Sequence, residues 1–93
     1  MNNNLTNQIS QKINMELVKI CGFKNAGHFM TRVVPGILAD FEKMIAKANL
    51  GETVKESYAF EDSTAEVTLK ALRKDGKNYV DMITEVWVNG KQL

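Results

Sequence analysis

The spacing of apolar side chains changes near residue 52, and this change divides the chain into a helical part and a strand part. Before residue 52 the apolar positions recur every three or four residues, which is typical of amphipathic helices. After it, apolar and polar side chains alternate, which is typical of strands with one buried face. The pattern therefore predicts helices first and strands afterwards.

The helical part contains two apolar stripes with a break between them. The first predicted helix ends at Gly22, because glycine adopts positive φ without a steric penalty. The second begins at Pro35, which suits the first helical turn but disfavours helical geometry at the preceding Val34. A kink and a full turn at this point both satisfy the pattern. The stripes consist of Leu5, Ile9, Ile13, Leu17 and Ile20, and of Ile37, Leu38, Phe41, Met44, Ile45 and Ala48.

The strand part is predicted to contain a β-hairpin from Thr64 to Val88. The pair Asp75-Gly76 suits a two-residue type I′ turn, since both residues tolerate positive φ. Counting outward from this turn places Glu66 opposite Glu85. The outer face of the hairpin then carries four apolar side chains among charged ones: Leu72, Tyr79, Ile83 and Trp87.

A further strand is predicted to precede the hairpin. A four-residue loop at 61–64 pairs Phe60 with Ala65, and this register adds Tyr58 to the apolar inner face. The same face carries one charged side chain, Glu56, which either lies at the rim or has a buried partner.

The composition is that of an ordinary globular protein. Apolar residues make up 44% of the chain and charged residues 25%, unlike a disordered segment. A chain of this size buries about 60–65% of its unfolded surface on folding, enough for one core without disulfides. We expect a single α+β domain over residues 1–93, with a frayed lead-in at 1–4. Its N-terminal helix and Pro-broken second helix are expected to pack on one face of a three-stranded antiparallel β-meander.

Few side chains are suited to catalysis or metal binding. Cys21 is the only cysteine and His28 the only histidine, so an intramolecular disulfide and the usual zinc sites are excluded. A catalytic pair, whether Cys21 with His28 or Glu66 with Glu85, would need an oriented base or burial that splits two pKa values. Neither pair has such neighbours, so we predict a protein that is not an enzyme and binds no cofactor and no metal.

The charge balance and the cysteine content indicate the surroundings of the protein. Twelve basic residues stand against eleven acidic ones, which disfavours binding through net charge. A lone cysteine suits a reducing compartment, and no apolar run approaches the roughly 18 residues of a membrane span. The expectation is a cytoplasmic protein that does not bind membranes.

The last predicted strand is the strongest candidate for function, because it is apolar on both faces. Such a strand is usually covered on both sides, and the end strand of a meander also has an unpaired edge. Tryptophan and tyrosine are frequent among interface hot spots. We therefore predict a small protein-binding module, an inhibitor or adaptor, that also forms homodimers. Its interface would be this strand and the outer sheet face, with Leu72, Tyr79, Ile83 and Trp87. Coverage of that face by the N-terminal helix or the C-terminal tail is the competing interpretation.

Two other functions fit particular residues. The basic hairpin tip resembles the wing of winged-helix DNA binders in charge, and suggests a nucleic-acid-contacting regulator that uses Lys70, Arg73, Lys74 and Lys77. Against this, the second helix exposes Asp40 and Glu42, unlike a recognition helix. A pocket between helices and sheet would suit an enzyme or a ligand carrier, with Glu56, Tyr58, Thr84 and His28 as its polar groups.

Overall fold

The computed structural model describes residues 3–60 and 65–93, with side chains from residue 8 onward. The elements are α1 (Asn3–Arg32), α2 (Val34–Lys47), β1 (Thr53–Ala59), β2 (Glu66–Leu72), α3 (Tyr79–Met82), β3 (Ile83–Val88) and β4 (Lys91–Gln92). The described strands form one antiparallel sheet in the order β1-β2-β3-β4. The predicted α+β class and antiparallel sheet are confirmed. Residues 1–2 of the predicted frayed lead-in and the loop at 61–64 lie outside the described residues.

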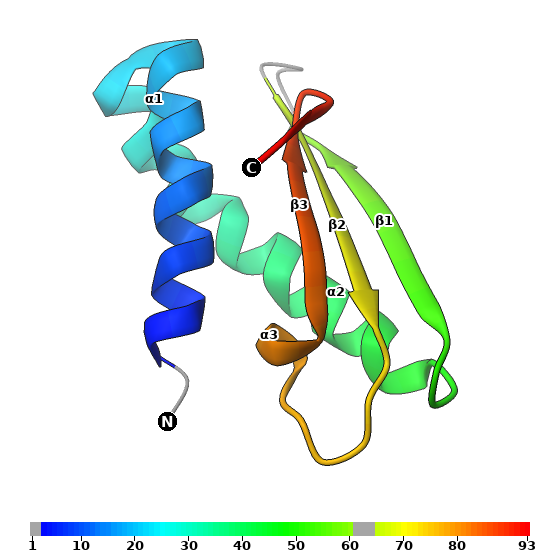
Figure 1. The fold of residues 1–93 in the computed structure, drawn as a ribbon. Coiled ribbons are helices and arrows are strands. Elements are labelled where there is room, and N and C mark those ends of the chain that lie inside the picture. Colours follow the sequence, from blue (N-terminus) through cyan, green and yellow to red (C-terminus); the bar gives the residue numbers. More distant parts are fainter. Residues whose placement is uncertain (1–2, 61–64) are drawn as a thin grey trace.

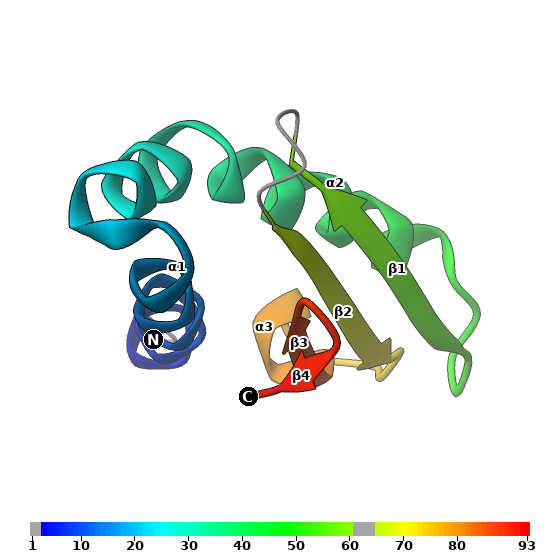
Figure 2. The same cartoon turned by 90° about the horizontal axis from the view of Figure 1, so that it is seen from above.

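Helix α1 bends sharply at Gly22, where φ is 84° and ψ is 167°. This backbone conformation is essentially restricted to glycine, which confirms the predicted break. The chain continues as a helix on both sides of it, so residues 23–32, which lie between the two predicted helices, are helical as well. Figures 1 and 2 show this second half of α1 leaving the axis of the first half and leading to α2.

The junction between α1 and α2 is a kink. Val33 has φ −109° and ψ −51°, close to helical values, and Pro35 lies in the first turn of α2. The Val33 amide donates to the Phe29 carbonyl at 2.9 Å, and the Ile37 amide donates to the Val33 carbonyl at 3.2 Å. Helical hydrogen bonds therefore reach across the junction, which decides the open question at Val34-Pro35 in favour of a kink.

The helices and the sheet enclose one apolar core. Helix α2 crosses one face of the sheet, while α1 stands beside the β3 side of it (Figures 1 and 2). Phe29 from the second half of α1 packs on Phe60 with 4.8 Å between ring centroids. The most deeply buried side chains are Ile13, Leu17, Val34, Phe41, Ile45, Val67, Leu69, Met82 and Val88.

The pairing of β1 with β2 follows the predicted register. Tyr58 lies opposite Val67, and the Phe60 amide donates to the Ala65 carbonyl at 2.9 Å. The side chains of β1 alternate between exposed and half-buried, with Glu56 among the half-buried ones. The period of two therefore identified both the strand and its inner face.

The predicted register of the second hairpin is wrong by four residues. Gly76 has φ 72°, but Asp75 does not have positive φ, so the type I′ turn is absent at this position. Residues 79–82 instead form α3, whose N-cap Asn78 accepts a hydrogen bond from the Asp81 amide at 3.2 Å. Strand β3 starts only at Ile83, and Glu85 pairs with Lys70 in place of Glu66.

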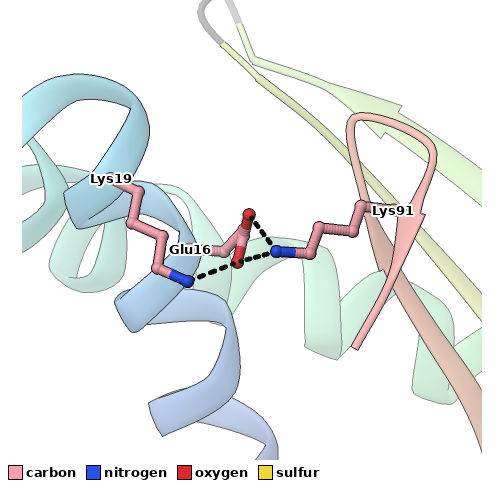
Figure 3. A network of polar contacts seen from close by, with 3 residues as sticks. All are labelled: Glu16, Lys19 and Lys91. Carbon is pink, nitrogen blue, oxygen red and sulfur yellow. Dashed lines mark hydrogen bonds and ion pairs between the residues drawn. The ribbon is translucent and has the colours of Figure 1, made fainter.

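A fourth strand extends the predicted three-stranded meander. Asn89 and Gly90 have φ of 51° and 81°, the values of a type I′ turn, and they return the chain along β3 as β4. Lys91 of this tail reaches α1, where its Nζ lies 3.3 Å from Glu16 Oε1 (Figure 3). Lys19 approaches the same carboxylate at 3.8 Å. The C-terminal tail thus contacts both the sheet and the first helix.

Candidate protein-binding surfaces

The outer face of the sheet, defined here as the side opposite α2, carries no other element among the described residues (Figure 2). Because side chains alternate along a strand, this face is made of every second residue. It consists of Thr53, Lys55, Ser57 and Ala59 on β1, Glu66, Thr68, Lys70 and Leu72 on β2, Glu85 and Trp87 on β3, and Gln92 on β4.

Trp87 lies on this face near the C-terminal end of β3. Its cross-strand neighbours are Thr68 on one side and Gln92 on the other. Lys55 Nζ stands 5.9 Å from the centroid of the indole ring, within the range of a cation–π contact. The side chain is half-buried, and its Nε1–H, hidden from solvent, has no acceptor in residues 3–60 and 65–93. Most buried N–H donors have a hydrogen-bond acceptor, so the indole N–H lacks an interaction that a buried donor usually makes.

Apart from Leu72 and Ala59, the rest of the outer face is polar, and four of its polar residues form two pairs. The hydroxyl groups of Ser57 and Thr68 are hydrogen-bonded at 2.8 Å. Lys70 Nζ lies 3.1 Å from Glu85 Oε2. The predicted opposition of Glu66 and Glu85 is therefore wrong, because the four-residue shift gives Glu85 a lysine as its neighbour. A carboxylate pair suited to acid–base chemistry does not form there.

The four residues predicted for the interface do not share one face. Leu72 and Trp87 lie on the outer face, whereas Tyr79 and Ile83 lie on the helix side, where they pack with Ile9 and Leu38. Two local features cause this difference. Tyr79 belongs to α3, and a bulge between Lys70 and Ala71 changes the register at Ile83. Burial and the nearby Glu42 carboxylate raise the pKa of the Tyr79 phenol.

The outward edge of β3 is only partly free. Trp87 pairs with Gln92 and Val88 with Lys91, and the Leu93 amide donates to the Val86 carbonyl at 2.9 Å. The expectation of a fully unpaired edge is therefore wrong for the C-terminal half of β3, because the tail occupies it. The tail lies at the edge of the strand and leaves the outer face itself open within the described residues.

Two of the four basic residues at the hairpin tip contact other side chains, and the other two are exposed. Lys70 is engaged by Glu85, and half-buried Arg73 directs Nη1 to Met82 Sδ at 3.8 Å. Lys74 and Lys77 are exposed in the loop between β2 and α3. The four basic residues therefore do not form one projecting cluster.

Cys21 and His28 do not form a nucleophile–base pair. The Cys21 thiol donates to the Leu17 carbonyl at 3.2 Å, one turn earlier in its own helix. His28 is exposed and its ring makes an edge contact with Phe29, at 5.6 Å between centroids. Thr84, another polar group of the proposed pocket, donates to the Lys70 carbonyl at 3.3 Å. Of the polar groups predicted for the pocket, His28 and Tyr58 line one common groove, whereas Glu56 and Thr84 do not.

A groove of about 740 Å³ lies on the helix side of β1, where a pocket between helices and sheet was one of the alternatives that the sequence left open. At one end the Tyr58 hydroxyl donates to Asp40 Oδ2 at 2.8 Å. Burial, followed by this hydrogen bond and the Asp40 charge, raises the pKa of Tyr58. Two residues that line the groove, Tyr58 and His28, belong to the polar groups predicted for such a pocket. The lining residues are His28, Arg32, Val33, Gly36, Ile37, Asp40, Ser57, Tyr58, Ala59 and Phe60.

Comparisons of the chain with protein-family models, curated proteins and solved structures find no significant match. Over the part of the chain that the structure describes, no three His, Cys, Asp or Glu side chains gather closely enough to hold a metal ion. In the same residues no helix has both the length and the apolar character needed to cross a membrane. A functional proposal therefore rests on the surfaces of the chain itself.

Proposed function

We propose that the chain is a small non-enzymatic protein-binding module, an inhibitor or adaptor, that docks through the outer face of its sheet. The observation that carries this proposal is the position of Trp87, half-buried between Thr68 and Gln92 on a largely polar sheet face that no described element covers. Trp87 and Leu72 supply the apolar contacts, and Lys55, Thr68 and Gln92 supply the polar ones around them.

The physical support comes from the chemistry of interface hot spots. Hot spots are enriched in tryptophan and lie near the centre of a contact area, surrounded by polar side chains that exclude water. Trp87 has this arrangement, with Thr68 and Gln92 beside it and Lys55 at its ring. Because the indole N–H is not satisfied within the described fold, rearrangement against a partner carbonyl would add a hydrogen bond.

Self-association belongs to the same proposal. The tail blocks the C-terminal half of the β3 edge, so two copies would meet face to face around Trp87. Trp87 is the only tryptophan, so its fluorescence reports directly on this face. Dimerisation through the face predicts a concentration-dependent blue shift of emission together with a doubling of the mass in sedimentation.

The test is affinity capture from the native host with wild-type protein and the variants Trp87→Ser and Leu72→Ser. Truncation of a hot-spot tryptophan costs about 2 kcal/mol or more, which weakens binding by roughly 30-fold. We expect a partner captured by wild type to be lost with Trp87→Ser and reduced with Leu72→Ser. Circular dichroism confirms that each variant is folded.

The matched control is Phe23→Ser. Phe23 is 83% exposed on α1, so its removal deletes an aromatic side chain far from the outer face. Capture should be unchanged in this variant. Equal retention of the partner by Trp87→Ser and wild type would move the interface away from the outer face.

A further inference from the structure

The free edge of β1 forms one wall of the groove described above. Strand β1 is the first in the sheet order, so only β2 pairs with it among the described strands. The Phe60 amide bonds to Ala65, and bonded residues alternate along an antiparallel strand. Ser57 and Ala59 therefore direct their backbone N–H and C=O groups away from β2. Their side chains point to the outer face, so they border the groove through these backbone groups.

The opposite wall comes from the kinked helices. Val33, Gly36 and Ile37 present a short apolar surface along the start of α2. A Cβ atom built on Gly36 would have no other atom within 4 Å, so this residue leaves open space beside the strand edge. The contact of Phe29 with Phe60 fixes the end of α1 against the end of β1.

The two ends of the groove differ in charge. At the Tyr58 end, Asp40 is occupied by the phenol hydroxyl at 2.8 Å. At the Phe60 end, α1 contributes Arg32 and His28, one basic and one titratable side chain. A ligand that runs along the strand edge would meet positive charge at this second end.

We infer that this groove binds an extended segment of another protein, which adds to β1 as a further strand. Strand addition uses main-chain hydrogen bonds for affinity and alternate side chains for specificity. In the groove, the backbone groups of Ser57 and Ala59 are available for main-chain hydrogen bonds. The apolar surface at Gly36 and Ile37 is available for alternate side chains of the segment. Because Arg32 is positively charged, we expect the bound segment to carry an acidic residue at the position that lies beside Arg32. This site is separate from the Trp87 face, so either can fail without the other.

The test uses four capped hexapeptides of alternating threonine and valine, with glutamate or lysine at either end. Binding is followed by amide chemical shifts of ¹⁵N-labelled protein. We expect shifts centred on Ser57, Ala59 and Gly36, with no change in Trp87 fluorescence. A glutamate peptide should bind about threefold to fivefold more tightly than its lysine twin, as expected for an exposed ion pair.

Two variants and a matched control examine the walls separately. Ala59→Pro removes an outward N–H, which an edge strand tolerates, and Gly36→Leu fills the open space. Each should weaken binding by about tenfold, the effect of losing one hydrogen bond or the contact surface. Thr53→Pro alters the same edge beyond the groove and should leave binding within about twofold.

Three results would overturn the inference. The first is the absence of shifts at Ser57 and Ala59 with every peptide at millimolar concentration. The second is unchanged peptide affinity in Gly36→Leu. The third is a set of shifts at these amides that depends on protein concentration alone, which would identify a second copy of the chain as the occupant.

Discussion

Substitution of Gly22 by alanine tests the bend that positions the second half of α1. The backbone at this residue has φ 84° and ψ 167°, a combination that costs a residue with a side chain about 1–3 kcal/mol. A Cβ at Gly22 would meet no other atom within 4 Å, so the cost is backbone strain without a steric clash. The bend carries Phe29 to Phe60 and His28 to the groove.

The net effect is smaller than the strain because alanine also restricts the unfolded chain. That restriction stabilises the folded state by about 0.4–1 kcal/mol, which leaves a net loss of about 1.3 kcal/mol at the middle of both ranges. For a domain of this size the loss lowers the Tm by about 5–10 °C. Thermal unfolding followed by circular dichroism, together with urea unfolding, measures both quantities.

A pair of controls separates backbone strain from the loss of a glycine as such. Gly27 lies in the same helix with helical backbone, so Gly27→Ala should raise stability by up to about 1 kcal/mol. A chemically synthesised chain with D-alanine at position 22 should regain wild-type stability, because the mirror-image residue favours positive φ. Equal free energies of unfolding for Gly22→Ala and Gly27→Ala would show that Gly22 carries no backbone strain penalty.

Two further predictions concern single hydrogen bonds. Tyr58→Phe removes the donor to Asp40 and should lower the free energy of unfolding by about 1 kcal/mol near neutral pH, measured in urea. Because the pKa of Tyr58 is raised in the folded state, its stabilising contribution is complete below the ordinary value of 10.0 and decreases as pH rises above it. Wild type should therefore lose more stability than Tyr58→Phe between pH 9 and about pH 11, and parallel losses would contradict this. Asn89→Ala should lower stability by about 1–2 kcal/mol, since Asn89 has φ 51° and accepts the Glu66 amide at 2.8 Å. Asn89→Gly should recover the part of the lost unfolding free energy that is due to backbone strain. If both variants lose the same unfolding free energy, the hydrogen bond alone accounts for the loss.

The parts of the fold that depend on local patterns could be predicted from the sequence. The change of period located the helices and strands, and Gly22 marked the bend. Asn89-Gly90 turned the chain as its composition suggests, with positive φ at both residues. The pairing of Phe60 with Ala65 followed from loop length and face alternation together. In each case the local preference and the buried face require the same conformation.

The second hairpin shows where local preference fails. Asp75-Gly76 favours a tight turn, but one turn of helix capped by Asn78 places Val80 and Met82 in the interior. Tertiary burial therefore outweighs the turn preference, and the register moves by four residues. An even shift preserves the alternation of faces, so Trp87 stays on the outer face as predicted. Ile83 changes face because the adjacent bulge interrupts the alternation.

The groove could be predicted only in part, through Tyr58 and His28, because its shape depends on how distant segments meet. His28, Asp40 and Ser57 belong to three elements, and only the bend and the kink of the helices bring them to one strand edge. The apolar pattern identifies which residues are buried against something. It does not identify which helix residues will face the free edge of a strand.

The most direct measurement for the outer face is photo-crosslinking in the host cell from position 92. Gln92 is exposed and lies directly opposite Trp87, so a benzophenone side chain there samples the proposed interface without entering the core. The control position is Lys43, exposed on α2. We expect a discrete protein adduct from position 92 that Trp87→Ser abolishes, and none of the same mass from position 43. Adducts of equal yield from both positions, or an adduct from position 92 unaffected by Trp87→Ser, would contradict this expectation.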